Sequence, residues 1–217
     1  MIRAPKKGSD MQELINLVKN IQKDKEVASK INSRILSFKE LNSKSNREWF
    51  SELCFCILTA NSKAETAIRI QNELGYTGFI SFDKEQISKA IRQNKHRFHN
   101  TKANYIIQAR KFSNIKDLLP SNELNAREWL SENVNGLGLK ESSHFLRNVG
   151  YKNLAILDRH VLNILFEFKL IKKIPNLSLK NYLFLEEILS KLCKKTDLSQ
   201  AELDMYLWYS KTSKVLK

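Results

Sequence analysis

The sequence is poor in residues that interrupt helices. Its 217 residues include only 6 glycines and 3 prolines, so strong turn signals are few. It also has no apolar run of the roughly 18 to 20 residues that a membrane span needs. The basic first ten residues, MIRAPKKGSD, precede no apolar segment of the kind found in secretory signals. We therefore expect an intracellular protein, not bound to a membrane, made of helices joined by short loops.

Cysteine is also scarce. Cys54, Cys56 and Cys193 are odd in number and unevenly spaced, which excludes a disulfide framework. Two of them lie in the apolar run LCFCIL, where buried thiols are a simpler interpretation than metal or redox chemistry. His96 and His99 are spaced like a metal-binding pair, but no further ligand is near them in the sequence. We expect these histidines at the surface and predict no metal site.

Acidic residues are outnumbered, with 23 Asp and Glu against 37 Lys and Arg and a formal net charge of +14. Because 42% of the residues are hydrophobic, the chain can build a packed core and is not a disordered polycation. The excess charge fits a nucleic acid, an anionic membrane surface, or a solvated face without a partner. Composition alone favours nucleic acid.

The hydrophobic pattern predicts an all-α fold. Leu14, Leu17, Val18 and Ile21 follow the spacing of an amphipathic helix, and Ile31–Phe38 repeats it. The run WFSELCFCILTA, after Ser45, is apolar nearly all round and predicts a central buried helix. We expect further helices at Thr66–Leu74, Lys84–Arg92, Thr101–Phe112, Ala126–Asn133, Lys140–Val149 and Asp158–Phe168, and within Leu179–Lys194 and Ser199–Ser210. No repeat or long linker divides the chain into independent domains.

The most informative motif is NGLGLKESS, which joins two expected helices. Gly136 and Gly138 are placed where a tight turn needs positive φ and close backbone approach. The turn leads to the start of a helix, whose free amides and dipole attract a phosphate. This pattern is typical of a helix-hairpin-helix motif, although a plain helix connection with a glycine cap gives the same glycines.

Lys140 and Asp158 are the candidate catalytic pair. At the start of a helix, Lys140 experiences the positive end of the dipole, which disfavours its charged form and favours a nucleophilic amine. Asp158 stands in LDRH at an expected helix start. Taken singly, Lys140 fits a surface lysine and Asp158 fits an N-cap.

The same motifs resemble those of the helix-hairpin-helix (HhH-GPD) DNA glycosylase superfamily. The runs EWFSELCFCILTAN, HRFHNTKANYI, SHFLRNVGY, ILDRH, SQAELDMYLWY and KVLK are similar to the archaeal-type 8-oxoguanine DNA glycosylase/AP lyase family, over about residues 44–217. The resemblance implies two helical subdomains with the active site in the cleft between them. We expect one subdomain at roughly residues 53–160 and the other from roughly 1–52 with 161–217.

The resemblance implies bifunctional excision of 8-oxoguanine from double-stranded DNA. The oxidised base is flipped out of the duplex. Lys140 then attacks C1′, and the resulting Schiff base permits β-elimination of the 3′ phosphate. Asp158 helps to activate the amine and stabilises positive charge at the sugar.

The resemblance also implies roles for residues around this pair. It assigns the contacts with backbone phosphates to the hairpin and one histidine. It assigns contacts with the gap left by the flipped base, and with the unpaired base opposite it (the estranged base), to a loop and a basic turn. Recognition of the flipped base is assigned to the C-terminal segment. The implied residues are Gly136, Leu137, Gly138 and His160 for phosphate, Asn61, Arg97 and Phe98 for the gap, and Trp208 and Lys217 for the base. From composition alone, Trp208 is a core aromatic and the basic turn a solvated helix start.

Some features depart from the wider superfamily. Only Cys193 lies in the C-terminal half, so the four-cysteine iron–sulfur cluster of many relatives cannot form. We expect no cofactor apart from a monovalent cation held by hairpin carbonyls, and a monomer associated with the nucleoid. The alternatives are a glycosylase for another lesion that uses the same Lys140 and Asp158, and a non-catalytic DNA-binding module.

Overall fold

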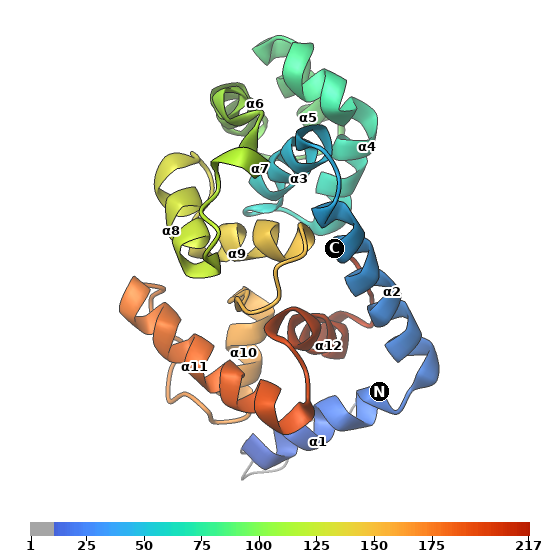
Figure 1. Ribbon diagram of the computed structural model, residues 1–217, viewed down its shortest axis with the longest axis vertical. Coiled ribbons are helices and arrows are strands. Elements are labelled where there is room, and N and C mark those ends of the chain that lie inside the picture. Colours follow the sequence, from blue (N-terminus) through green and yellow to red (C-terminus); the bar gives the residue numbers. More distant parts are fainter. Residues whose placement is uncertain (1–10) are drawn as a thin grey trace. The chain divides into compact units, whose positions relative to one another are not determined.

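The computed structural model describes residues 11–217 (Figure 1). The basic segment 1–10 lies outside the described residues. Helices and loops make up the described part of the chain, in which no β-strand is found. The chain divides into two compact units. Unit 1 comprises residues up to Leu36 and Lys152–Val215, and unit 2 comprises Ser37–Tyr151 with Leu216–Lys217.

Unit 1 contains four complete helices and the first part of α2 (Lys25–Asn42). The complete helices are α1 (Met11–Gln22), α10 (Arg159–Glu167), α11 (Leu179–Thr196) and α12 (Gln200–Thr212). Its core lies where α10 packs on α12 and α1 packs on both α11 and α12. Leu14, Val18, Leu165 and Leu192 are fully buried there.

Unit 2 is built around α3 (Asn46–Thr59). Its other helices are α4 (Ala64–Ser81), α5 (Lys84–Gln93), α6 (His99–Ala109), α7 (Ile115–Leu118), α8 (Glu123–Asn133) and α9 (Leu139–Asn148), with a 3-10 helix at Arg110–Phe112. α3 contacts α4, α6, α7 and α9. From Leu53 to Leu58 every residue of α3 is fully buried, including Cys54 and Cys56. The predictions of a central buried helix and of buried thiols are confirmed.

Local signals explain where several helices begin. Ser45 and Glu48 form a reciprocal capping box at α3, Asp83 and Gln86 form another at α5, and Ser199 and Glu202 a third at α12. Each box satisfies backbone amides that have no partner within the helix. α4 is broken at Gly75, whose φ of +55° is a left-handed conformation that glycine adopts without strain. The expected helices are all present, with shifted ends.

The subdomain boundaries differ from those expected. Boundaries near residues 53 and 160 would cut α3 and α10, whereas the structure divides the chain inside α2 and after Tyr151. The physical reason is that α3 packs as a whole against helices of unit 2, and α10 packs as a whole on α12 in unit 1.

Candidate active site and DNA interface

The hairpin between α8 and α9 is a tight turn that requires one of its glycines. Gly136 has φ +92°, and a Cβ built on it would lie 2.5 Å from Cδ2 of Tyr105. The turn is closed by the Leu137 amide, which donates to the Val134 carbonyl at 3.1 Å. Gly138 differs from the expectation, because its φ of −98° is negative and a Cβ built on it would make only an ordinary contact, 3.5 Å from Glu141 Oε2. It serves instead as the N-cap of α9, where its amide donates to Glu141 Oε2 at 3.3 Å.

Lys140 is the second residue of α9, directly after this turn. Its Nζ lies 2.7 Å from Glu141 Oε1, and 26% of its side chain is exposed. The lysine is therefore accessible to a large substrate while held by a carboxylate of the same helix turn. The first amides of α9 point toward the same end of the helix, as at any helix N-terminus, and this arrangement suits an anion.

A second lysine lies close to the hairpin and was not identified from the sequence. Lys102 on α6 is only 4% exposed, and its Nζ lies 5.9 Å from the ring centroid of Tyr105, the residue that packs on Gly136. Burial lowers the pKa of Lys102 to about 8; Glu141 opposes this shift and Lys140 adds to it. The signal in the sequence was its inward position, because Lys102 shares the buried face of α6 with Ala103, Ile106 and Ala109.

Asp158 lies in unit 1, at the start of α10. Its Oδ1 accepts from the Val161 amide at 2.8 Å, so the N-cap interpretation is confirmed. The extended, buried segment before it is held by α11: Glu186 accepts from the Ala155 amide at 2.7 Å, and Tyr182 donates to the Ala155 carbonyl at 2.8 Å. These contacts determine where the carboxylate is placed within unit 1.

Two other candidate residues belong to the same unit. His160 follows Asp158 in the first turn of α10 and is half-buried. Trp208 on α12 is also half-buried, whereas Leu203–Leu207 just before it are buried. Trp208 is therefore only partly enclosed in the core.

His96 links the turn that carries Arg97 and Phe98 to the end of α3, which precedes Asn61. Its Nε2 lies 2.9 Å from the Leu58 carbonyl near the end of α3, and its Nδ1 accepts from the Phe98 amide. Asn61, two residues after α3, is exposed with φ +60°. The exposed Arg97 guanidinium lies 5.1 Å from the Phe98 ring centroid. A basic group and an aromatic ring are thus exposed on the turn that His96 links to the end of α3.

The expectation that His96 lies at the surface was wrong. It is 3% exposed, because it links the 96–98 turn to α3. Burial lowers the pKa of His96, and the nearby Lys102, Arg97 and His99 charges lower it further, whereas the Leu58 bond opposes them. The neutral imidazole with its proton on Nε2 satisfies both contacts. Among residues 11–217 no group of three or more His, Cys, Asp or Glu side chains is arranged to hold a metal ion.

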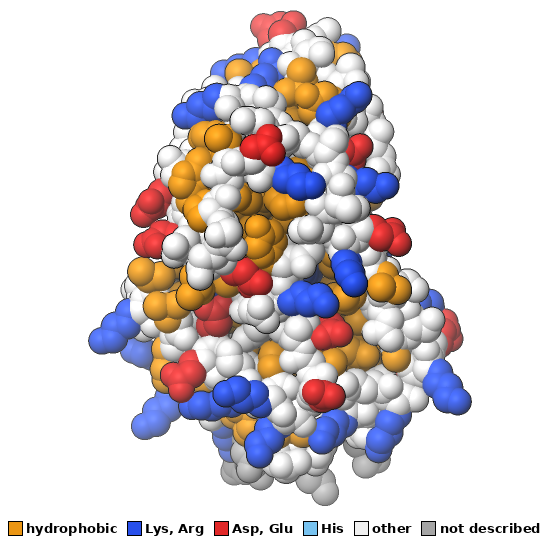
Figure 2. Space-filling model, in the orientation of Figure 1, with side chains coloured by type: hydrophobic (Ala, Val, Ile, Leu, Met, Phe, Trp, Pro, Cys, Tyr) orange, Lys and Arg blue, Asp and Glu red, His pale blue; other side chains and the backbone are white. Residues whose placement is uncertain are grey.

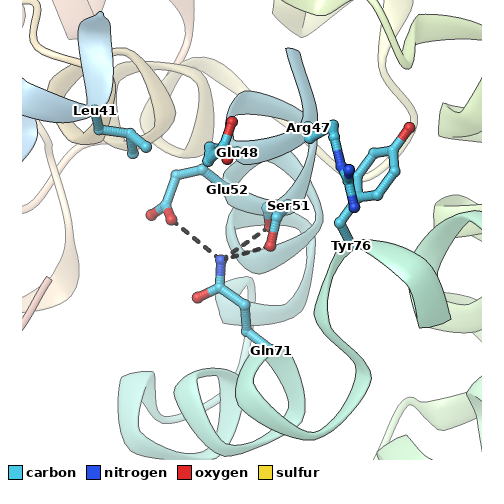
Figure 3. Close-up of a pocket in the computed structure, with 7 residues that line it drawn as sticks. All are labelled: Leu41, Arg47, Glu48, Ser51, Glu52, Gln71 and Tyr76. Atoms are coloured by element: carbon cyan, nitrogen blue, oxygen red, sulfur yellow. Dashed lines mark hydrogen bonds between the residues drawn. The ribbon is translucent and has the colours of Figure 1, made fainter. Parts of the chain in front are cut away.

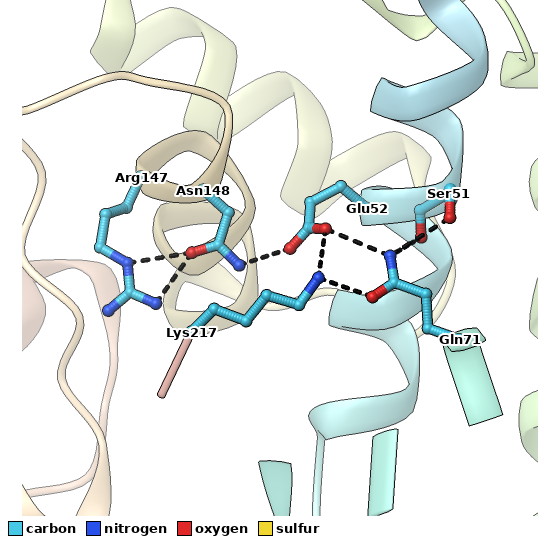
Figure 4. A network of polar contacts seen from close by, with 6 residues as sticks. All are labelled: Ser51, Glu52, Gln71, Arg147, Asn148 and Lys217. Atoms are coloured by element: carbon cyan, nitrogen blue, oxygen red, sulfur yellow. Dashed lines mark hydrogen bonds and ion pairs between the residues drawn. The ribbon is translucent and has the colours of Figure 1, made fainter. Parts of the chain in front are cut away.

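Lys217 reaches a polar network in unit 2 (Figure 4). Its Nζ lies 2.7 Å from Glu52 Oε2 and 2.6 Å from Gln71 Oε1. Gln71 also borders an open pocket of about 390 Å³, together with Ser51, Glu52 and the stacked pair Arg47 and Tyr76 (Figure 3). Glu52 and Gln71 were not identified from the sequence. The signal for Glu52 was a carboxylate inside the otherwise apolar run WFSELCFCIL.

Charged side chains are dispersed on the face shown in Figure 2, where Lys and Arg are scattered with Asp and Glu side chains between them. None of the described helices is long and apolar enough to cross a membrane. A dispersed positive surface suits contacts with DNA phosphates that do not depend on sequence.

Comparison with known proteins identifies the family. A family model described as 8-oxoguanine DNA glycosylase, of the helix-hairpin-helix type, matches residues 31–198. The chain belongs to this family. The 8-oxoguanine DNA glycosylase/AP lyase of Methanocaldococcus jannaschii is 49% identical over 206 residues, which cover 93% of this chain and 99% of that protein. The protein of the same name from Thermotoga maritima is 40% identical over 210 residues, which cover 95% of this chain and 100% of that protein.

Two solved structures of the family share the fold. The M. jannaschii 8-oxoguanine glycosylase/lyase, in complex with a 15mer DNA containing 8-oxoguanine, matches 94% of this chain and 100% of its own with a TM-score of 0.91 and 46% identity. The T. maritima 8-oxoguanine DNA glycosylase matches 95% of this chain and 100% of its own with a TM-score of 0.90 and 39% identity. The all-α HhH-GPD fold predicted from the sequence is confirmed.

Proposed function

We propose that this protein excises 8-oxoguanine from double-stranded DNA and then cleaves the strand at the resulting abasic site. The position of Lys140 is the observation that supports this function. In a chain that belongs to the 8-oxoguanine DNA glycosylase family, it is an accessible amine one residue inside α9, directly after the Gly136–Gly138 turn.

Lys140 performs both reactions. Its neutral Nζ attacks C1′ of the damaged nucleotide while the N-glycosidic bond breaks, and the base leaves with the bonding electron pair. Ring opening of the deoxyribose converts the adduct to a protonated imine. Loss of a C2′ proton then breaks the C3′–O bond and releases the 3′ phosphate, with the imine as electron sink. Water finally hydrolyses the imine and restores the lysine.

Asp158 has two roles in this mechanism. One carboxylate oxygen caps α10, and the charge of the group stabilises the positive charge that develops on the sugar. His160 in the same turn and the first amides of α9 bind backbone phosphates. The hairpin carbonyls are suited to hold a monovalent cation there, and the reaction requires no other cofactor.

Base recognition involves Trp208 and Lys217. The Trp208 ring stacks on the extruded purine, and a backbone oxygen of Lys217 accepts a hydrogen bond from a purine N–H. Asn61, Arg97 and Phe98 fill the gap and contact the estranged base. We expect the protein to act as a monomer inside the cell, on the DNA of the nucleoid.

Borohydride trapping tests the proposal. Duplexes that carry 8-oxoguanine, thymine glycol or uracil are incubated with the protein and sodium borohydride, which reduces the imine to a stable adduct. We expect an adduct with the 8-oxoguanine duplex and none with Lys140→Gln. An adduct formed by the variant would overturn the role of Lys140. Trapping on another lesion instead of 8-oxoguanine would indicate a different substrate, and no adduct at all would indicate a DNA-binding module.

A further inference from the structure

The Lys217 side chain is held by three groups on α3 and α4. Its Nζ contacts Glu52 Oε2 at 2.7 Å and Gln71 Oε1 at 2.6 Å, and it lies 4.2 Å from the ring centroid of Phe55. A carboxylate, an amide oxygen and an aromatic face are all groups that attract an ammonium ion. Figure 4 shows the lysine extending into this network.

Glu52 is held in place before it binds the lysine. It is 3% exposed, and its other oxygen, Oε1, accepts from Asn148 Nδ2 at 2.6 Å. Asn148 is in turn oriented by two bonds from the Arg147 guanidinium, at 3.0 and 2.8 Å. Gln71 is fixed by donating to Ser51 and to Glu52 Oε2. The carboxylate therefore cannot swing away, and it presents one oxygen to one ammonium.

The network extends to α9, the helix that carries the proposed nucleophile Lys140. Lys140, His144 and Asn148 recur every four residues on α9, so they form one stripe along its surface. Asn148 binds Glu52, and the His144 ring makes an edge contact with Phe55, with 5.8 Å between the ring centroids. Phe55 is also the ring that faces the Lys217 ammonium. Lys217 is thus linked to the α9 stripe through Glu52 and through Phe55, and His144 lies one helical turn from Lys140.

Stability does not explain this arrangement. Removing two charges from water costs free energy that an ion pair recovers only in part, and an apolar pair of similar volume is often at least as stable. A buried carboxylate surrounded by the apolar residues of α3 is better explained by its effect on position. It selects a single cation and determines where that cation is placed.

We propose that Glu52 is a positioning residue for base recognition, which fixes Lys217 beside the α9 stripe. This inference rests on the proposed role of Lys217 in contacting the extruded base. Glu52 touches neither base nor sugar in this role. Its loss should therefore impair the step that needs the base more than the step that does not.

The test compares two reactions of the full-length protein. Glu52→Gln keeps the shape of the side chain and removes its charge. We expect kcat/KM for 8-oxoguanine excision to fall about tenfold or more, as for loss of a charged hydrogen bond, while cleavage of a preformed abasic site changes by less than about threefold. Glu85→Gln, which makes the same charge change at an exposed site on α5, should alter neither reaction.

A second variant keeps the inference falsifiable if Glu52→Gln folds poorly. Lys217→Met should give the same loss of excision relative to abasic cleavage, Lys217→Arg should restore part of it, and the double variant should be no worse than the more impaired single variant. Equal losses in both reactions, or additive losses in the double variant, would overturn the role of Glu52. A different result would contradict the proposed mechanism itself, namely strand cleavage that is retained by Lys140→Gln.

Discussion

The ammonium of Lys140 lies 2.7 Å from the carboxylate of Glu141, its neighbour on α9. Coulomb attraction at this distance holds the lysine side chain against its own helix turn, whereas attack on C1′ requires Nζ to leave this contact. Glu141 also accepts from the Gly138 amide through its other oxygen. The residue that caps the helix therefore also restrains the nucleophile in the DNA-free state.

Glu141→Gln separates these two effects, because glutamine keeps an oxygen for the Gly138 amide and loses the charge. We expect borohydride trapping on 8-oxoguanine DNA to be about threefold faster than for the unmodified protein, since Lys140 no longer has to leave an ion pair before it reaches C1′. Single-turnover trapping rates provide the measurement. A slower rate would show that the carboxylate assists the reaction.

Asp158→Asn distinguishes the helix cap from the charge. Asparagine is as good an N-cap as aspartate, so the melting temperature and DNA affinity should stay close to those of the unmodified protein. Turnover should fall about a hundredfold, because the charge that stabilises the transition state is lost. Asp158→Ala, which also removes the cap, should cost about 1 kcal/mol of stability in addition. Unchanged turnover in the asparagine variant would leave only the capping role.

Gly136 and Gly138 form a matched pair that tests the hairpin geometry. Gly136→Ala places a Cβ 2.5 Å from the Tyr105 ring at a φ of +92°, so we expect a loss of about 2 kcal/mol or more of unfolding free energy, together with weaker DNA binding. At Gly138 the backbone φ is negative, and the Cβ added by Gly138→Ala would make only an ordinary contact, 3.5 Å from Glu141 Oε2. This substitution should cost less than about 1 kcal/mol. Chemical denaturation of both variants measures the difference, and equal losses would contradict the geometry.

Lys102 gives a pH dependence whose sign follows from its lowered pKa. Between pH 8 and 10.5 the folded protein has released this proton while the unfolded chain retains it, so stability from this group rises with pH and is lowest below pH 8. Lys102→Met removes the buried charge. We expect the variant to be more stable at pH 7, by at most roughly 3 kcal/mol, with a gain that shrinks toward pH 10.5. Urea denaturation at pH 7 and pH 10 checks this; a gain that grows with pH would contradict it.

Local features of this protein could be predicted from the sequence. The buried α3, the amphipathic helices and the turn at Gly136 follow from hydrophobic spacing and from the backbone freedom of glycine, which act over a few neighbouring residues. The positions of Lys140 after the turn and of Asp158 at an N-cap follow in the same way. The family was also identified from these runs, and the comparisons confirm it.

Only the tertiary structure decided which distant residues meet. Glu52 and Lys217 are 165 positions apart, and no local pattern could pair them. His96 was expected at the surface but is buried where it links the 96–98 turn to α3, and Lys102 is buried because it lies on the inward face of α6. The division of the chain inside α2 likewise depends on which helices pack together. Sequence spacing determines helices and turns, whereas the burial and pairing of polar side chains depend on how those helices pack.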